Sequence, residues 1–133
     1  MDSKFYVDVV LTSCGRFDLL KEAIDSFFMY LDENCKVESF ILIDDSGKPE
    51  AREVIEEILA VFAQRTQLVV LINEVNIGQV ASIDKAYAYV TQPYFFHLED
   101  DWRFVRTGFM TRSLEVLEAR TDIINLWLRA MYD

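Results

Sequence analysis

Short apolar runs alternate with amphipathic segments along the chain, and this alternation constrains the fold more than any other feature. The apolar runs indicate buried strands at residues 7–11, 40–43, 68–72, 94–98 and 123–128. Helical periodicity separates them at residues 17–31, after Pro49, at 80–90 and at 107–119. Strands that are apolar throughout are typical of a parallel sheet. The sequence therefore predicts one three-layer α/β domain over residues 1–133, with helices on both faces of a mostly parallel sheet.

The third helical segment has a predicted buried face of its own. Its apolar residues recur every three or four positions, at Val80, Ile83, Tyr87 and Val90. This spacing places them on one side of a helix, and we expect that side to pack on the sheet.

Composition and charge exclude several classes of protein. Of the 133 residues, 52% are hydrophobic, which is too apolar for a disordered chain. Acidic residues outnumber basic ones by 23 to 13, for a net charge of −10, and the basic residues are scattered. Nucleic acids and anionic membranes require clustered Lys and Arg, so we expect neither as a partner.

The sequence also carries signals about location. No apolar stretch approaches the roughly 20 residues of a membrane-spanning helix, so no transmembrane segment is expected. The first ten residues, MDSKFYVDVV, lack the pattern of a signal peptide. Cys14 and Cys35 lie far apart in unlike surroundings, without metal-ligand spacing. Two reduced cysteines favour a cytoplasmic protein.

Polar residues follow four of the predicted strands. They lie at residues 12–16, 44–45, 76–78 and 99–101. Ligands of parallel sheets bind outside the carboxyl ends of the strands, near the point where the strand order reverses. We therefore expect these four loops to line one crevice.

Three consecutive carboxylates, Glu99, Asp100 and Asp101, form the most unusual of these loops. They repel one another, so a positive partner is expected. If the chain stays extended past Leu98, Glu99 and Asp101 share one face and form a hard-oxygen site for Mg²⁺ or Mn²⁺. The alternative is a strand end whose acids face water. His97, inside the strand, is expected to be a packed and hydrogen-bonded residue.

The other loops carry candidate ligand-binding residues, each with an ordinary structural alternative. Asp44 or Asp45 can accept hydrogen bonds from a base or ribose, but Asp-Asp-Ser-Gly is also a common turn. Arg16 can hold a phosphate or stack on a base, or can be a surface arginine. Gly78 permits a close backbone approach at a helix start. Lys85 either reaches the crevice or lies on a solvated helix face.

Four segments resemble the nucleotide-sugar-binding half of GT-A glycosyltransferases, in particular the family-2-like group. They are VVLTSCGRFDLLKEAIDSFF at 9–28, ILIDDSG at 41–47, NIGQVASIDKAYAY at 76–89 and FFHLEDDW at 95–102. They occur in the family's order and span most of the chain. The resemblance implies a Rossmann-like half-domain that binds a nucleoside-diphosphate sugar, most often UDP-linked. It also implies sugar transfer to an acceptor with the help of Mn²⁺ or Mg²⁺.

The resemblance implies roles for the residues that would contact the nucleotide. Thr12 and Arg16 would border the base. Asp44 or Asp45 would contact a uracil-like base or the ribose. These assignments place the nucleotide over the carboxyl ends of the first two strands.

Further roles follow from the other two segments. The acidic triplet would be the family's DxD-type motif, with Glu in its first position, a variant that the family also shows. Asp101 would bind the metal directly, and Glu99 or Asp100 would face the ribose or a metal-bound water. Gly78 and Lys85 correspond to the family's helix after the third strand. The metal would stabilise the leaving nucleoside diphosphate.

The chain departs from the family's pattern in one respect. GT-A enzymes recognise the acceptor, and inverting members place the catalytic base, in a C-terminal half for which no segment is found here. We therefore assign no catalytic residue, and expect a fragment, a chain that works with a partner, or a protein that binds without turnover. An incomplete sheet leaves an apolar edge, so self-association is expected.

Three other functions stay open at this point. The first is a non-catalytic nucleotide-sugar-binding or interaction module. The second is a nucleotidyltransferase, although TSCGRFD is a poor match for the Gly-rich basic loop of that class. The third is an α/β domain without a ligand.

Overall fold

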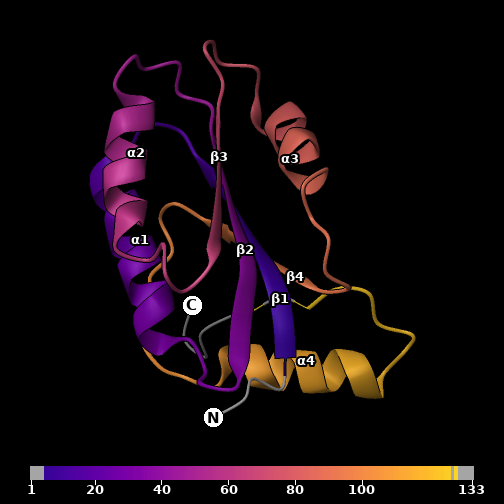
Figure 1. Ribbon diagram of the computed structural model, residues 1–133. Coiled ribbons are helices and arrows are strands. Elements are labelled where there is room, and N and C mark those ends of the chain that lie inside the picture. Colours follow the sequence, from indigo (N-terminus) through magenta and orange to yellow (C-terminus); the bar gives the residue numbers. More distant parts are fainter. Residues whose placement is uncertain (1–4, 127, 129–133) are drawn as a thin grey trace.

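The computed structural model describes residues 5–126 and residue 128. Its four strands are β1 (Phe5–Ser13), β2 (Cys35–Asp44), β3 (Gln67–Ile72) and β4 (Phe95–Glu99). They form one parallel sheet in the order β3-β2-β1-β4 (Figure 1). The central strand β1 therefore pairs with β2 on one side and β4 on the other. The first four predicted strands are confirmed.

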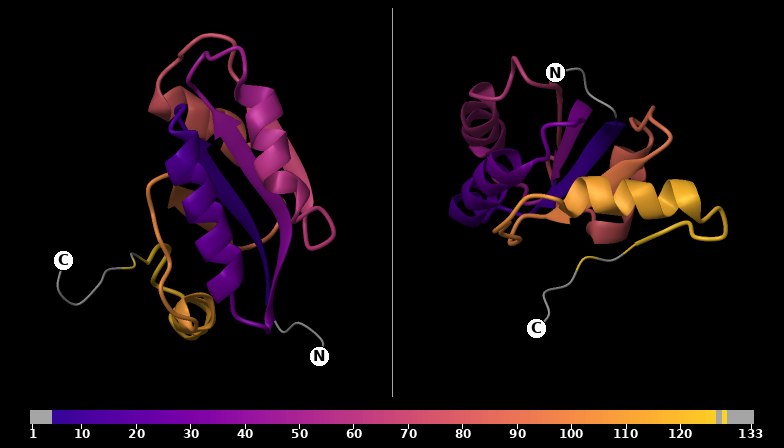
Figure 2. Two further views of the ribbon diagram at one scale, coloured as in Figure 1. Left: turned by 90° about the vertical axis from the view of Figure 1, so that its left-hand side faces the viewer. Right: turned by 90° about the horizontal axis from the view of Figure 1, so that it is seen from below.

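Four helices surround this sheet in the described residues, namely α1 (Phe17–Tyr30), α2 (Ala51–Ala60), α3 (Gln79–Tyr87) and α4 (Phe109–Ala119). Helices α1 and α2 lie together on one face, and α3 lies on the other, against β1 and β2 (Figures 1 and 2). Helix α4 lies below the amino-terminal end of β1 (Figure 1). This arrangement confirms the predicted fold class. None of these described helices is long and apolar enough to cross a bilayer.

The larger core lies between the sheet and helix α1, and its centre is aromatic. Phe27 is fully buried, and five phenylalanine rings have centroids 5.2 to 6.1 Å from its own: Phe28, Phe40, Phe96, Phe104 and Phe109. Two of these rings belong to the segment after β4. The predicted apolar stripe of α1 therefore packs on the sheet and also anchors the chain that follows the acidic triplet.

The buried face of helix α3 agrees only in part with the predicted one. Its buried residues are Ser82 and Ala86, whereas Val80 is 76% exposed and Tyr87 is 38% exposed. Small side chains let the helix approach β1 and β2 closely, where Ala86 packs with Val10 in a second, smaller core. The prediction that Val80 faces the sheet is therefore wrong, whereas Tyr87, although partly exposed, has its ring 4.8 Å from that of Phe95 on β4.

The predicted fifth strand is not observed in the described residues. Residues 123–126 and 128 belong to no helix or strand, and Trp127 lies outside the described residues. Ile123 N donates to Arg120 O at 3.2 Å, so helix α4 leads into a turn. An apolar run such as residues 123–128 forms a strand only where a neighbouring strand pairs with it. The sheet of the described residues ends at β4, which is an edge strand.

Candidate functional site

The carboxyl ends of the strands bring the predicted loops together. Parallel pairing places Thr12 beside Glu99 and Ser13 beside Asp44. Thr12 Oγ1 donates to Glu99 Oε2 at 2.7 Å, and Ser13 Oγ donates to Asp44 Oδ1 at 3.1 Å. Residues from β1, β2 and β4 therefore meet at one edge of the sheet, as the sequence predicts.

The acidic triplet does not continue the strand. β4 ends at Glu99, and Asp100 and Asp101 lie in a turn in which Trp102 N donates to Glu99 O at 3.3 Å. The extended geometry that would put Glu99 and Asp101 on one face therefore stops at Glu99. Instead Asp100 is buried and Asp101 is exposed, so the three carboxylates have different surroundings.

Arg16 supplies the positive charge next to the triplet. Its Nη2 donates to Asp100 Oδ1 at 2.6 Å and lies 3.9 Å from Asp101 Oδ2. The side chain of Asp100 is 4% exposed, and that of Arg16 is 53% exposed. The hydrogen bond to Asp100 raises the pKa of Arg16 above its ordinary value. The loop after β1 therefore holds the turn after β4 through a charged pair.

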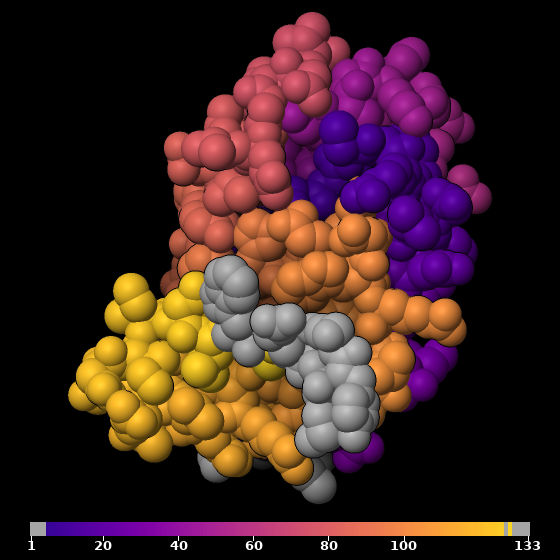
Figure 3. Space-filling view, turned by 180° about the vertical axis from the view of Figure 1, so that it is seen from behind, coloured from indigo at the N-terminus to yellow at the C-terminus, as the bar shows by residue number. Residues whose placement is uncertain are grey.

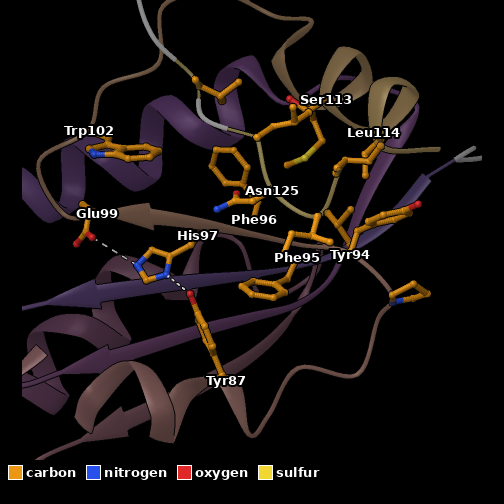
Figure 4. Close-up of a pocket in the computed structure, with 17 residues that line it drawn as sticks. Tyr87, Tyr94, Phe95, Phe96, His97, Glu99, Trp102, Ser113, Leu114 and Asn125 are labelled. Carbon is orange, nitrogen blue, oxygen red and sulfur yellow. Dashed lines mark hydrogen bonds and ion pairs between the residues drawn. The ribbon is translucent and has the colours of Figure 1, made fainter. Parts of the chain in front are cut away.

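Glu99 is held by groups from three elements. Besides Thr12 on β1, Gln79 Nε2 of α3 donates to Glu99 Oε1 at 3.3 Å. His97 Nε2 lies 3.5 Å from the same oxygen, and the Tyr87 hydroxyl is 2.9 Å from His97 Nδ1 (Figure 4). The contact with His97 and the hydrogen bond from Thr12 lower the pKa of Glu99, although burial opposes them. Glu99 is therefore a fixed anion.

Asp45 joins the end of β2 to the start of α3. Its Oδ1 accepts hydrogen bonds from Ile77 N at 2.7 Å and from Asn73 Nδ2 at 3.0 Å, and its Oδ2 accepts one from Gly78 N at 2.9 Å. Burial alone would raise the pKa of Asp45, but these hydrogen bonds together lower it. Both carboxylate oxygens are thus already engaged by donors of the protein.

Asp44 and Lys85 are held in a similar way. Asp44 is fully buried and accepts hydrogen bonds from Ser13 Oγ and from both the backbone and the hydroxyl of Ser46. Lys85 Nζ donates to Asn73 Oδ1 at 2.8 Å. The chain therefore bends at Ser46 just after β2, and Lys85 is tied to the residue after β3.

Sequence reasoning missed several residues of this site: Asn73, Gln79, Ser82 and Tyr87. Two of them carried a usable signal, because Asn73 follows β3 and Gln79 begins α3. A polar residue at the carboxyl end of a buried strand is a candidate for the same crevice. The other two lie within α3, whose orientation the periodicity did not predict.

The residues of the triplet fit a divalent cation in part. Among the described residues, no group of three or more His, Cys, Asp or Glu side chains is arranged to hold a metal. Asp100 Oδ2, however, is buried without a hydrogen-bond partner in the described part of the chain, and Asp101 beside it is exposed. Mg²⁺ and Mn²⁺ need only one or two protein carboxylates when waters and phosphate oxygens complete the shell. Asp100 and Asp101 can provide these one or two carboxylates.

A cavity of about 700 Å³ lies along β4 (Figure 4). Its lining is largely aromatic and aliphatic and includes Tyr94, Phe96, Trp102 and Leu114, with Glu99 also among the lining residues. Arg16, Asp100 and Asp101 are not part of the lining. Figure 3 shows that β4 and the loop after it reach the surface between α3 and α4. The cavity therefore adjoins the crevice without enclosing it.

Comparisons with known proteins agree with this arrangement. Residues 8–130 match the family model described as glycosyl transferase family 2. No curated protein matches the chain. A similar solved structure is the mannosyltransferase PcManGT from Pyrobaculum calidifontis in complex with GDP-Man and Mn²⁺, with a TM-score of 0.70 and 10% identity.

The likeness to PcManGT is one of fold. It covers 88% of this chain and 33% of that chain, so the present chain spans about a third of its length. The family model, by contrast, covers nearly all of the present chain. The chain belongs to glycosyl transferase family 2 and has the GT-A fold.

Proposed function

We propose that this chain is the donor-binding part of a metal-dependent glycosyltransferase, which transfers a sugar from a nucleoside-diphosphate sugar to an acceptor. The observation that carries the proposal is the acidic triplet at the carboxyl end of β4. Asp100 has a buried oxygen with no hydrogen-bond partner in the described residues, and Asp101 is exposed beside it. Membership of the family supports glycosyl transfer, and the GDP-Man and Mn²⁺ bound to PcManGT support the donor class and the metal.

In this proposal the three carboxylates of the triplet have different roles in binding the donor and the metal. Asp101 holds the Mn²⁺ or Mg²⁺ ion, and Glu99 or Asp100 faces the ribose or a metal-bound water. When bound, the cation neutralises the diphosphate and so stabilises the leaving nucleoside diphosphate. The fixed position of Glu99, hydrogen bonded to Thr12, supports a role in orienting the donor.

The remaining candidate residues bind or position the nucleotide in this proposal. Thr12 and Arg16 border the base and the phosphates. Asp44 or Asp45 contacts the base or ribose, and Asp45 also fixes the loop that ends at Gly78, where α3 begins. Lys85 acts through Asn73, to which it is hydrogen bonded. A UDP-linked donor is the first candidate, and the ligand of PcManGT makes a GDP-linked donor the second.

Two further points belong to the proposal. The two cysteines of the described structure are free, which supports a cytoplasmic location. A non-catalytic nucleotide-sugar-binding module is the other candidate function, because the family match and the fold are compatible with either. Hydrolysis or transfer of the donor separates the two functions, since only an enzyme releases the nucleoside diphosphate.

Titration calorimetry with UDP and with GDP, in Mn²⁺ and again in a chelator, tests the donor site. We expect binding in Mn²⁺ that the chelator abolishes. Asp101→Ala should weaken it by more than about tenfold, because the variant lacks the exposed carboxylate of the cation site. Asp122→Ala is the matched control, since it removes the same charge from an exposed surface pair with Arg120. Binding of neither nucleotide in either condition would refute the proposal.

A further inference from the structure

Arg16 occupies a position that no nucleotide-binding role by itself explains. It is the one Lys or Arg residue in the described part of the chain whose side chain lies within 4.0 Å of a carboxylate of the acidic triplet. Its Nη2 is 2.6 Å from Asp100 and 3.9 Å from Asp101, the residue proposed to hold the cation. In this structure the guanidinium therefore neutralises the carboxylates that a metal would need.

We infer that Arg16 is a built-in competitor of the metal, which makes metal and nucleotide bind interdependently. The inference rests on the proposed function. Without a ligand, Arg16 pairs with Asp100 and Asp101 and opposes a divalent cation at the same carboxylates. When a nucleoside diphosphate binds, its phosphate oxygens attract the guanidinium, and the cation takes the aspartates.

The chemistry of the guanidinium supports this exchange. Arginine stays protonated at any physiological pH, so its charge persists when a cation approaches. Repulsion between like charges a few ångströms apart weakens the binding of the second. A diphosphate offers the planar fork two or more acceptor oxygens, a geometry that suits arginine better than lysine. The same charge therefore opposes the metal alone and favours the metal together with the diphosphate.

The local structure allows the side chain to move while the backbone stays in place. The Arg16 side chain is 53% exposed, so its head group can leave Asp100 without opening the core. The backbone before it is fixed, because Lys48 Nζ donates to Gly15 O at 2.9 Å. A Cβ at Gly15, whose φ is +87°, would lie 2.9 Å from Lys48 Cε. The exchange thus needs only a new rotamer of Arg16.

Binding of Mn²⁺, followed by electron paramagnetic resonance of the free ion, tests the inference without an activity assay. The Mn²⁺ affinity is measured alone and with saturating UDP or GDP, for the wild type and Arg16→Gln. We expect Arg16→Gln to bind Mn²⁺ alone about three- to tenfold more tightly. The factor by which the nucleotide improves Mn²⁺ affinity should fall by a similar amount, because the variant has no guanidinium for the nucleotide to draw away from the aspartates.

Two further variants show whether the charge or the shape of the Arg16 side chain determines the Mn²⁺ affinity and its coupling to the nucleotide. Arg52→Gln changes the net charge equally on the exposed surface of α2, where Arg52 pairs with Glu56, and should leave both quantities unchanged. Arg16→Lys keeps the charge without the fork, so Mn²⁺ alone should bind as to the wild type while the coupling falls. This variant also carries the test if Arg16→Gln does not fold by circular dichroism.

The possible failures are distinguishable. If the wild type binds Mn²⁺ and nucleotide together, but Arg16→Gln has an unchanged or lower affinity for Mn²⁺ alone, the inference is overturned and the proposed function stands. A lower affinity would mean that Arg16 only positions Asp100. If the wild type binds neither metal nor nucleotide, the proposed function fails and the inference fails with it.

Discussion

At the scale of single residues, Asp45 shows how a carboxylate of the candidate crevice can have a structural role. It is buried, and it accepts hydrogen bonds from the backbone of Ile77 and Gly78 and from the side chain of Asn73. These donors come from the end of β3 and the loop before α3. Asp45 therefore connects the loop after β2 to the loop between β3 and α3, and its removal leaves these donors without their acceptor.

We predict that Asp45→Ala lowers the free energy of unfolding by about 2–4 kcal/mol, because the N–H groups of Ile77 and Gly78 and the buried amide of Asn73 lose their acceptor. Urea denaturation followed by circular dichroism measures the change. Asp122→Ala, in an exposed pair with Arg120, is the control and should have no measurable effect. An equally small effect of Asp45→Ala would show that the loop does not depend on this carboxylate.

The lowered pKa of Asp45 makes a second prediction, on acid stability. In the folded protein the pKa of Asp45 lies below its ordinary value of 3.8. The ionised carboxylate therefore stabilises the fold above that value, and this contribution is lost as the pH falls through the folded-state pKa. The difference in unfolding free energy between the wild type and Asp45→Asn should be constant from pH 7 to about pH 5 and shrink below pH 4. A difference that grows towards low pH would contradict it.

At the scale of elements, the turn into α3 depends on one backbone conformation. Gly78 has φ +96° and ψ 158°, a region that only glycine populates readily, and a Cβ there would meet no atom within 4 Å. Gly108, before α4, has φ +98° and ψ −16°, which is left-handed helical. A Cβ at Gly108 would likewise meet no atom closer than 4.0 Å, so substitution of either glycine tests backbone strain without steric overlap.

We predict that Gly78→Ala destabilises the protein by about 1–3 kcal/mol, entirely through backbone strain. Gly108→Ala should cost less, about 1–2 kcal/mol, because the left-handed helical region is more accessible to alanine. Thermal and urea unfolding of the two variants measure the difference. If Gly78→Ala is as stable as the wild type, the loop adopts another conformation in solution.

The elements also show how far the sequence alone predicts this protein. The four observed strands and α1 were predictable from continuous apolar runs and the stripe from Leu20 to Phe28, although a similar run at 123–128 wrongly predicted a fifth strand. The face of α3 was not, because Ser82 and Ala86 are buried through close packing and the hydrogen bond between Ser82 and Asn73, not through hydrophobicity.

The candidate site was predictable in its location and not in its contacts. The rule for parallel sheets places the four loops at one edge, and the structure brings them together. The pairing of Arg16 with Asp100 depends on a turn that begins after Glu99, and nothing in the apolar pattern marks where an extended strand ends. The roles of these residues towards a ligand remain predictions.

At the scale of the whole molecule, the sheet of the described residues ends at an exposed strand. The outer edge of β4 has no partner strand in the described residues, and Phe95 on it is 42% exposed. An apolar edge strand favours pairing with another copy. We predict self-association that rises with concentration, measured by sedimentation velocity.

A charge on the edge should prevent this association. Phe95→Lys is expected to shift the protein towards the monomer, because a lysine on an edge strand opposes pairing. Val61→Lys, an equally drastic change of an exposed residue after α2, is the control and should leave the association unchanged. A wild-type protein that is monodisperse and monomeric at high concentration would contradict the prediction.

The order of the strands has a consequence for how the molecule forms. β1, β2 and β3 are successive neighbours in both sequence and space, whereas Thr12 on β1 meets Glu99 on β4 across 87 positions of chain. Contacts between such distant residues form slowly, because a long loop must close first. On a ribosome, a three-stranded sheet can assemble before β4 has been synthesised. The acidic turn and the arginine that holds it therefore meet late, so the candidate site is completed only after the first three strands can pair.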